Sequence, residues 1–315
     1  MLKRIVVITP GFFHLDALIH EELKNYAEEV VEIIERSDRK LAKIILRLNL
    51  PLLSNVYRER RFEYIYKKSQ IADQLLIFNP EVIRQPQLDK LRKISTEIKI
   101  YLWDSTLTKP SYVKLAQCSH AKIFTFDYAD SLKYGWTYLP LFGTSEVHNT
   151  FESKRKGISF IGTLYGNRLR KIQEISRVAN EHGIIFTAHL YCKTFLHLAY
   201  YKFLNFGRSN SLNITRQKAT RDFLNQNLIE SKYVLDLSND DQAGMSFRTF
   251  EALSNGCILI TDNNQALKEF KDDPNVQSID WFTSRQSVKK SAINFNDTNT
   301  YHDYHISNFI SKLIK

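Results

Sequence analysis

The sequence is poor in cysteine, and it has no apolar run long enough to span a membrane. Its 315 residues include three cysteines, Cys118, Cys192 and Cys257. An odd number without metal-ligand spacing argues against a disulfide framework and a cysteine zinc site, and it favours a reducing, cytoplasmic compartment. Cys257 lies inside an apolar run, which predicts a buried thiol that packs as a small hydrophobic side chain. The first apolar run ends at Pro10-Gly11 and predicts a strand rather than a membrane span.

The sequence also lacks internal repeats and low-complexity tracts, and its composition is that of a globular protein. Hydrophobic residues make up 43% and charged residues 25% of the chain. Its length favours two domains. The formal net charge is +10, and residues 36–68 hold ten Lys/Arg against three Asp/Glu. Such a block favours contact with a polyanion or an anionic membrane, or else it forms the solvated face of a helix.

Strands and helices are predicted to alternate, which favours a parallel, doubly wound sheet. The first half is predicted to form one Rossmann-like domain over residues 1–145. Its strands are marked by continuous apolar runs, as expected for strands that are buried on both faces. The predicted strands are 5–9, 74–79, 98–103, 122–126 and 139–142, and the predicted helices are 14–35, 87–95 and 112–118.

After a polar stretch at residues 143–157, the alternation starts again and predicts a second Rossmann-like domain over residues 157–300. Its predicted strands are 158–162, 184–190, 233–237 and 257–261, and its predicted helices are 167–182, 220–229 and 247–255, with an aromatic-rich insertion at 195–206. The last predicted helix lies within residues 301–315 and carries an apolar stripe of Ile306, Phe309, Ile310 and Leu313. This stripe must pack against another element, and the N-terminal domain is one candidate.

Residues 238–261 are the most informative for function. A polar loop containing Gly244 leads to a helix that begins near Ser246. The free N–H groups and the dipole of a helix start form an anion site, and a glycine leaves room for a phosphate. Arg248 can add a bidentate cation, and Glu251 can accept hydrogen bonds from ribose hydroxyls. On pattern alone, the alternative is an ordinary α/β connection in which Arg248 and Glu251 form an i, i+3 pair.

The segment Gly-x-Ser-x-Arg-x-x-Glu-Ala-Leu-x-x-Gly-Cys-x-Leu-Ile-Thr, residues 244–261, resembles the donor-site motif of GT-B glycosyltransferases. The nearest group is the CgeB-like, capsule and lipopolysaccharide type, which residues 101–142 and 158–168 also resemble. The resemblance implies an α/β fold of two Rossmann-like domains facing a central cleft, with a nucleotide-sugar on the C-terminal domain. The donor-binding residues that it implies are the ribose-binding Glu251, the diphosphate loop Gly244, Met245 and Ser246, the turn Gly162 and Thr163, and the cations Arg168 and Arg248.

One position departs from the family pattern, and the catalytic base that an inverting enzyme needs is expected on the N-terminal side. Many retaining GT-B enzymes have a second glutamate where this chain has Ala243, so retention or inversion stays open. The candidate bases are His14, after the first strand, and Asp104, at the end of another strand. The alternatives are a satisfied helix-start residue for His14 and an N-cap for Asp104, and Asp127 is expected to be a cap or turn residue. No metal or other cofactor is expected, and the acidic pair 240–241 is expected to solvate its loop.

The resemblance implies a glycosyltransferase that moves a sugar from a nucleotide-sugar to a saccharide or lipid-linked acceptor in bacterial surface polysaccharide synthesis. Residues 36–68, with an apolar face at 41–48, are the candidate contact with the inner face of the cytoplasmic membrane, and the aromatic residues of 195–206 add to it. A core helix with a solvated back is the alternative. Rival functions are a catalytically silent nucleotide-sugar-binding or scaffold module, a GT-B-type epimerase, and a nucleic-acid-binding protein. The last is disfavoured because no recognised nucleic-acid module is present.

Overall fold

The computed structural model describes residues 1–11, 14–36, 51–117, 120–144, 155–207, 211–238, 243–283, 301 and 303–315. The chain forms two compact units. The first unit contains residues 1–141, 240–244 and 306–315, and the second contains residues 142–239 and 245–305. Each unit has its own hydrophobic core around a six-stranded sheet. Among the described residues, no helix is both long and apolar enough to cross a bilayer.

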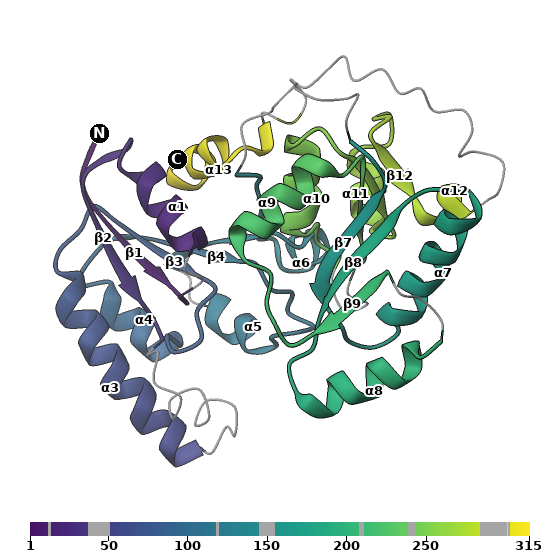
Figure 1. Ribbon diagram of the computed structural model, residues 1–315. Helices are drawn as coiled ribbons and strands as arrows, with labels where there is room; N and C mark the ends of the chain where they lie inside the picture. Colours follow the sequence, from purple (N-terminus) through teal and green to yellow (C-terminus); the bar gives the residue numbers. More distant parts are fainter. Residues whose placement is uncertain are drawn as a thin grey trace. The chain divides into compact units, whose positions relative to one another are not determined.

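The strands of the first sheet are all parallel and follow the order β2-β1-β3-β4-β5-β6 (Figure 1). The strands are β1 (Leu2–Thr9), β2 (Ala27–Ile34), β3 (Gln74–Phe78), β4 (Glu97–Leu102), β5 (Ala121–Thr125) and β6 (Thr137–Tyr138). The helices are α1 (His14–Leu23), α3 (Pro51–Ser69), α4 (Gln85–Leu91), α5 (Ser111–Ala116), α6 (Tyr128–Tyr134) and α13 (Ile306–Ile314). The direction of winding reverses between β1 and β3, as in other doubly wound sheets.

Two predicted elements of this unit are wrong. The sequence predicts one helix over residues 14–35, but α1 ends at Leu23 and residues 27–34 form the edge strand β2. The β-branched pairs Val30-Val31 and Ile33-Ile34 suit a pleated strand, and pairing along the length of β1 outweighs the helix propensity of the glutamates between them. The strand expected at 139–142 is instead the short β6, two residues upstream.

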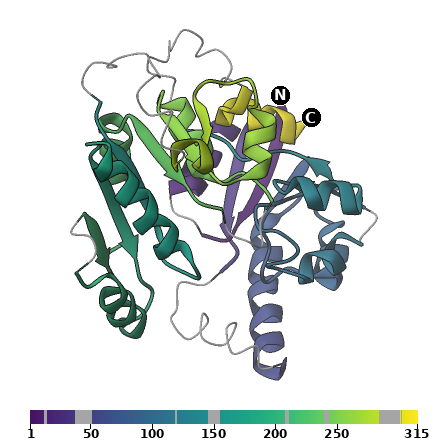
Figure 2. The ribbon, with the colours of Figure 1, turned by 90° about the vertical axis from the view of Figure 1, so that its right-hand side faces the viewer.

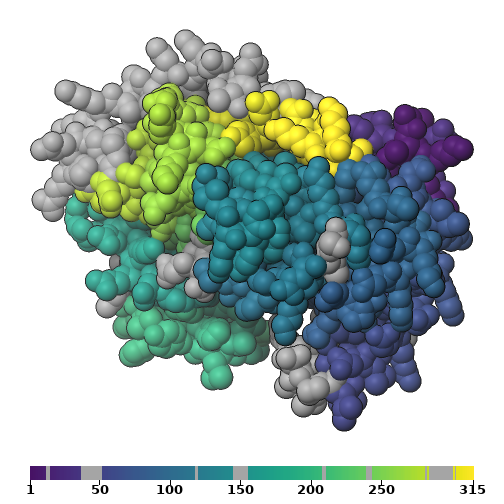
Figure 3. Space-filling model, turned by 180° about the vertical axis from the view of Figure 1, so that it is seen from behind, coloured from purple at the N-terminus to yellow at the C-terminus, as the bar shows by residue number. Residues whose placement is uncertain are grey.

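Helices cover both faces of the first sheet. One face packs against α3, α4 and α5, through a core that includes the strand residues Val6, Ile8, Leu75, Ile77 and Ile100 and the helix residues Phe62, Ile65, Leu88, Leu91, Tyr112 and Leu115. The other face is covered by α1 and α13, which contact each other. In Figure 3, α13 (yellow) lies beside the purple N-terminal residues.

Helix α13 confirms the predicted apolar stripe, since Ile306, Phe309, Ile310 and Leu313 are all buried. The rings of Phe309 and Tyr101 meet edge to face with centroids 4.8 Å apart. Two polar side chains of the sheet reach the end of the helix. Gln74 Nε2 donates to the carbonyl oxygen of Ile314 at 2.9 Å, and Lys99 Nζ donates to the same oxygen. The last helix is therefore part of the first unit's core.

The second sheet is also fully parallel, in the order β12-β11-β10-β7-β8-β9 (Figure 1). Its strands are β7 (Ile158–Thr163), β8 (Phe186–Tyr191), β9 (Leu212–Thr215), β10 (Tyr233–Asp236), β11 (Ile258–Thr261) and β12 (Val276–Ser278). Counted within the unit, this is the 3-2-1-4-5-6 order of the dinucleotide-binding fold. The switch point lies between β7 and β10. Strands β9 and β12, at the two edges, were not predicted from the sequence.

The helices of the second unit are α7 (Arg168–Glu181), α8 (Phe195–Asn205), α9 (Arg221–Glu230), α10 (Phe247–Ser254), α11 (Asn264–Glu269) and α12 (Ile279–Thr283). Helix α7 lies along the sheet (Figure 2) and buries Leu169, Ile172 and Ile175 in its core. Helix α8 lies beside the edge strand β9. Cys257, just before β11, is fully buried, which confirms its prediction as a core residue.

Candidate functional site

The carboxyl ends of β7 and β10 lie next to each other at the switch point of the second sheet. Doubly wound sheets bind their ligands outside such strand ends. Gly162 and Thr163 close β7, and Asp236 closes β10. Helix α7 begins at Arg168, and helix α10 begins after its N-cap Ser246. The elements that carry most of the predicted donor-binding residues therefore belong to this one edge of the sheet.

Asp236 holds the start of α10 against the end of β10. The aspartate is 2% exposed, and its carboxylate accepts three side-chain hydrogen bonds. Ser246 Oγ and Thr249 Oγ1 each donate to Oδ2 at 2.8 Å, and Arg248 Nη1 donates to Oδ1 at 2.6 Å. Ser246 Oγ also accepts the N–H of Arg248 at 3.1 Å, as an N-cap does. One buried carboxylate thus fixes the position of the first turn of α10.

Arg248 is tied to the protein but keeps part of its surface exposed. Besides its ion pair with Asp236, its Nη2 donates to the carbonyl oxygen of Ile161 at 2.7 Å. Its guanidinium carbon lies 5.0 Å from the centroid of the Phe160 ring. The side chain is 23% exposed. Because a guanidinium has five N–H donors, Arg248 can hold Asp236 and still donate to an anion.

Arg168 lies near Arg248 but is more deeply buried, with 8% of the residue exposed. Its Nη1 donates to the carbonyl oxygen of Thr163 at 3.1 Å. Its Nη2 donates to the carbonyl oxygen of Leu237 at 2.6 Å and to the hydroxyl of Tyr165, whose ring lies 3.9 Å from the guanidinium carbon. Burial lowers the pKa of Arg168, and the charge of Arg248 acts in the same direction. Arg168 therefore bridges the loops after β7 and β10.

Glu251 lies one turn further along α10 and forms an ion pair that the sequence did not predict. Arg221 Nη1, at the start of α9, donates to Glu251 Oε1 at 2.7 Å. Arg221 Nη2 also donates to the hydroxyl of Thr144. The glutamate side chain is 16% exposed and the arginine side chain 29%. The ion pair with Arg221 therefore holds the carboxylate in one orientation.

Two of the predicted glycines are in close packing contact with phenylalanines. A Cβ at Gly162 would lie 2.9 Å from Cζ of Phe160 and 3.2 Å from Nη2 of Arg248. A Cβ at Gly244, which belongs to the first unit as Phe126 does, would lie 2.5 Å from Cε2 of Phe126 and 2.8 Å from its carbonyl oxygen. The close contact with Phe126 therefore explains why residue 244 is a glycine, and a bound phosphate is not needed to explain it. The adjacent Met245 is buried at 1% exposure.

Asp127 confirms its prediction as a capping residue. Its Oδ1 accepts the N–H of Asp130 at 3.1 Å in the first turn of α6. Its Oδ2 accepts the N–H of Ala243 at 3.1 Å. The acidic pair 240–241 lies outside the described residues. Asp127 is thus a structural residue of the first unit.

Of the two candidate bases, Asp104 has a defined environment, whereas the side chain of His14 lies outside the described part of the structure. Asp104 Oδ2 accepts a hydrogen bond from Asn79 Nδ2 at 2.8 Å and an ion pair from Lys109 Nζ at 2.8 Å. Asn79 has a positive φ of 47°, a conformation that non-glycine residues rarely adopt and that clusters at functional sites. Burial lowers the pKa of Lys109, but Asp104 and Glu81 outweigh this effect and raise it. Asp104 therefore faces a protonated lysine.

The carboxylate of Glu35 is fully buried beneath the loop that follows β3. It accepts the N–H groups of Glu81, Val82 and Ile83 at 2.7 to 2.8 Å. Burial raises the pKa of Glu35 from 4.5 to about 7, against the opposing effect of these three hydrogen bonds. The folded protein therefore binds a proton that the unfolded chain releases between these two pH values.

The first unit is expected to lose stability as the pH rises from about 4.5 to about 7, because Glu35 ionises more readily in the unfolded chain. The contribution is about 3 kcal/mol, present in full below pH 4.5 and lost above pH 7. The measurement is urea unfolding at several pH values for the wild type and for Glu35→Gln, which has no proton to lose. The difference between the two proteins should change across this range. A constant difference would contradict the prediction.

Three residues of the second-unit site were missed by the sequence analysis. Asp236 closes an apolar strand, Arg221 opens α9, and Phe160 underlies both candidate cations. The sequence offers one signal for Asp236, because a charged residue at the carboxyl end of a buried strand indicates a site residue. Arg221 and Phe160 carry none, since arginines at helix starts and phenylalanines in strands are common.

No protein-family model matches the chain, and a search of curated protein sequences finds no match. Solved structures do match over nearly its full length. The N-terminal domain of trehalose-6-phosphate phosphatase from Candida albicans has a TM-score of 0.65 at 10% identity, covering 99% of this chain and 95% of that one. A UDP-forming α,α-trehalose-phosphate synthase from Burkholderia xenovorans, in complex with glucose-6-phosphate, has a TM-score of 0.62 at 10% identity, covering 99% of each chain. The complex of MnaA from S. aureus with UDP has a TM-score of 0.58 at 12% identity, covering 100% and 95%.

At these identities the likeness is one of fold. Two parallel six-stranded sheets flanked by helices are what the chain has in common with these proteins. The predicted class of two Rossmann-like α/β domains is confirmed, and the chain has a GT-B-type fold.

Proposed function

We propose that the chain is a glycosyltransferase that uses a nucleotide-sugar, and that its second unit binds the donor. The observation that carries the proposal is the switch point of the second sheet. There the capped first turn of α10, the partly exposed Arg248 and the oriented Glu251 follow the end of β10, which pairs with β7. The helix start and the cation suit the diphosphate of a nucleoside diphosphate, and the carboxylate suits its ribose hydroxyls.

The proposed chemistry breaks the bond between the sugar's anomeric carbon and the diphosphate oxygen. The acceptor hydroxyl oxygen forms the new bond to that carbon, and its proton passes to a base, for which Asp104 and His14 stay the candidates. The departing diphosphate gains negative charge, which the N–H groups of the first turn of α10 and the guanidinium of Arg248 stabilise. Arg168 holds the loops after β7 and β10 in place. No metal ion is required in this scheme.

UDP is the nucleotide to test first. Two of the similar structures are described as a UDP complex and as a UDP-forming enzyme, which supports this choice without extending their substrates to this chain. The sequence resemblance supports a saccharide or lipid-linked acceptor in bacterial surface polysaccharide synthesis. A catalytically silent binding module would bind the nucleotide-sugar without transferring or hydrolysing it.

Contact with a membrane is part of the proposal, because a lipid-linked acceptor requires it. Helix α8 supports it, since Phe195, Leu196, Tyr200 and Phe203 are exposed by 57% or more, a large apolar surface for one short helix. In the basic segment 36–68, α3 exposes Leu52, Leu53 and Val56 and buries Phe62 and Ile65, while the apolar face predicted at 41–48 lies outside the described residues. Sedimentation with anionic vesicles at low salt tests this, and a protein that stays in the supernatant would refute it.

Glu251→Ala is expected to weaken UDP binding about ten-fold or more, because each hydrogen bond to a charged group contributes about 1.5–3 kcal/mol. The protein should stay folded, since the substitution removes one ion pair, whose arginine is partly exposed, and no core side chain. Isothermal titration with UDP and UDP-sugars measures the effect. Glu230→Ala, which removes an exposed carboxylate from α9, is the matched control and should bind UDP as the wild type does. Equal affinity in the two variants would remove Glu251 from the site.

A further inference from the structure

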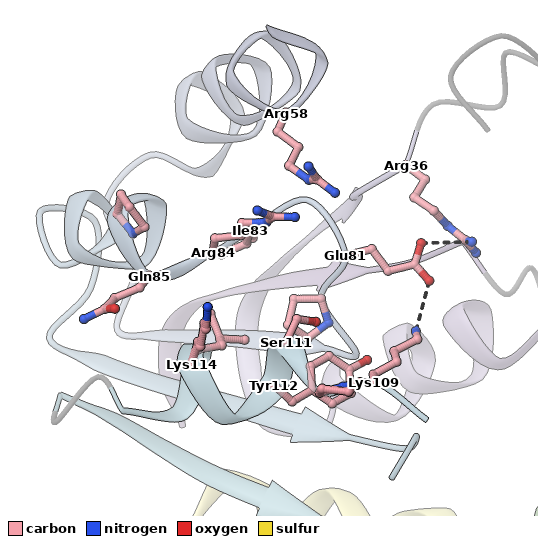
Figure 4. A pocket seen from close by; sticks show the side chains of 14 residues that line it. Arg36, Arg58, Glu81, Ile83, Arg84, Gln85, Lys109, Ser111, Tyr112 and Lys114 are labelled. Atoms are coloured by element: carbon pink, nitrogen blue, oxygen red, sulfur yellow. Dashed lines mark hydrogen bonds and ion pairs between the residues drawn. The ribbon is translucent and has the colours of Figure 1, made fainter. Parts of the chain in front are cut away.

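A pocket of about 920 Å³ opens in the first unit, beyond the carboxyl ends of β2, β3 and β4 (Figure 4). Its walls come from the end of β2, from α3, and from the segments 80–86 and 109–115. The charged residues that line it are Arg36, Arg58, Glu81, Arg84, Lys109 and Lys114. Five of the six are cations, so the pocket is strongly positive.

Two of these cations are neutralised within the protein. Arg36 Nη1 lies 3.2 Å from Glu81 Oε2, and Lys109 Nζ lies 3.1 Å from Glu81 Oε1. Lys109 also pairs with Asp104. Figure 4 shows these three side chains together at one end of the pocket. This end is an internal ion-pair network that leaves little charge for a ligand.

The other three cations, Arg58, Arg84 and Lys114, form no ion pair with any described residue. They come from three different elements, α3, the loop after β3, and α5. Figure 4 shows the guanidinium groups of Arg58 and Arg84 pointing into the same part of the pocket. A concave surface with three unpaired cations from separate elements attracts anions more strongly than a row of lysines on one helix does.

Arg58 is the cation that most needs an anionic partner. It is 7% exposed, and within the described residues its Nε has no hydrogen-bond partner. Burial lowers its pKa and the charge of Arg84 lowers it further, while the charge of Glu35 opposes them without reversing the direction. The position cannot relax easily into solvent, because Phe62 and Ile65 on the same helix are fully buried in the core. No carboxylate of the described residues forms an ion pair with Arg58, and burying a cation without an ion pair is costly, so an external anion is the partner that this position favours.

We propose that this pocket binds a phosphate group of a ligand, through Arg58, Arg84 and Lys114. Two guanidinium forks and an ammonium match the charge and the several oxygens of a phosphate monoester or diphosphate better than they match a single carboxylate. The pocket volume leaves room for a sugar beside that group. If the transferase proposed above is correct, the phosphate-bearing ligand is its acceptor, either a soluble sugar phosphate or a lipid-linked one.

The experiment compares Arg58→Met with the wild type and with Arg60→Met, an exposed arginine of the same helix. Isothermal titration with pyrophosphate and with a hexose phosphate should give binding to the wild type and to Arg60→Met. Arg58→Met should bind at least ten-fold more weakly. The ligand-free Arg58→Met protein should melt at the same or a higher temperature, because methionine fills the space without a buried charge. A higher melting temperature with weaker ligand binding excludes misfolding as the cause.

Vesicles distinguish the two sources of the phosphate. Neutral-lipid vesicles that carry an isoprenoid phosphate should retain the wild type and release Arg58→Met if the ligand is lipid-linked. Binding of soluble hexose phosphate without vesicle retention indicates a soluble ligand. Absence of binding to every phosphate, or equal binding by Arg58→Met and the wild type, would overturn the proposal. UDP binding, measured on the same samples, reports on the second unit, so failure of the donor site is recognised separately.

Discussion

Asp236→Ala is expected to lower the free energy of unfolding of the second unit by about 3–5 kcal/mol. The substitution removes the acceptor of three hydrogen bonds and leaves the charge of Arg248 without its partner 2.6 Å away. Ser246 and Thr249 would then lose their buried acceptor as well. Because these bonds hold the first turn of α10, UDP binding should weaken together with stability. Chemical unfolding followed by circular dichroism, and UDP titration below the midpoint, measure the two effects.

The matched control for Asp236→Ala is Glu181→Ala, which breaks an exposed ion pair with Arg177 in the same unit. Exposed pairs contribute little, so its effect should stay within about 0.5 kcal/mol. Asp236→Asn should fall between the two, since an amide keeps one oxygen acceptor but places an N–H₂ group where the other carboxylate oxygen was. If Asp236→Ala and Glu181→Ala are equally stable, the carboxylate does not organise α10.

Phe309→Ala is expected to lower the stability of the first unit by about 3–5 kcal/mol, the usual cost of removing a buried aromatic ring. The ring is 2% exposed and meets Tyr101 edge to face. Its loss leaves a cavity between α13 and the sheet, in a place where Gln74 and Lys99 hold the end of the helix and limit its collapse. Hydrogen exchange should speed up in β1, β3 and β4 and stay unchanged in β7 and β10.

Lys312→Ala serves as the control for Phe309→Ala, because it shortens an exposed side chain of the same helix. Its exchange rates should match those of the wild type. Exchange is the better measurement here, since a chain of two units need not unfold in a single step. Faster exchange in both units, or in neither, would show that α13 is not a specific part of the first unit's core.

The fully buried strands could be predicted from the sequence, and the edge strands could not. Strands β1, β3 and β10 each contain a continuous, buried apolar run, as expected for strands that are covered on both faces. Strand β2 is an edge strand in which most residues are exposed or half-buried, and its glutamates at 28, 29 and 32 fit a helix as well as a strand. The pairing of β2 with β1 joins residues more than twenty positions apart, and this pairing favours the strand over the helix. Patterns among neighbouring residues do not predict such a contact.

The sequence predicts those features of the candidate site that depend on neighbouring residues in the chain. It does not predict the contacts that join separate elements. Ser246 as the N-cap of α10 could be predicted because a cap is a local arrangement. The links from Asp236 to Arg248 and from Glu251 to Arg221 join separate elements. Arg58 belongs to the basic segment 36–68, and such segments most often form the solvated face of a helix. Its burial is evident only in the folded unit.

The late position of α13 in the sequence has a consequence for synthesis on the ribosome. The strands of the first sheet end at Tyr138, but α13, which covers one face together with α1, begins at Ile306. At bacterial or eukaryotic elongation rates this delay is on the order of ten to thirty seconds. During that time the face of the sheet around Tyr101 lacks the Phe309 ring that packs on it in the folded protein. Translation pauses between these two points should therefore lower the yield of folded protein more than pauses before residue 138.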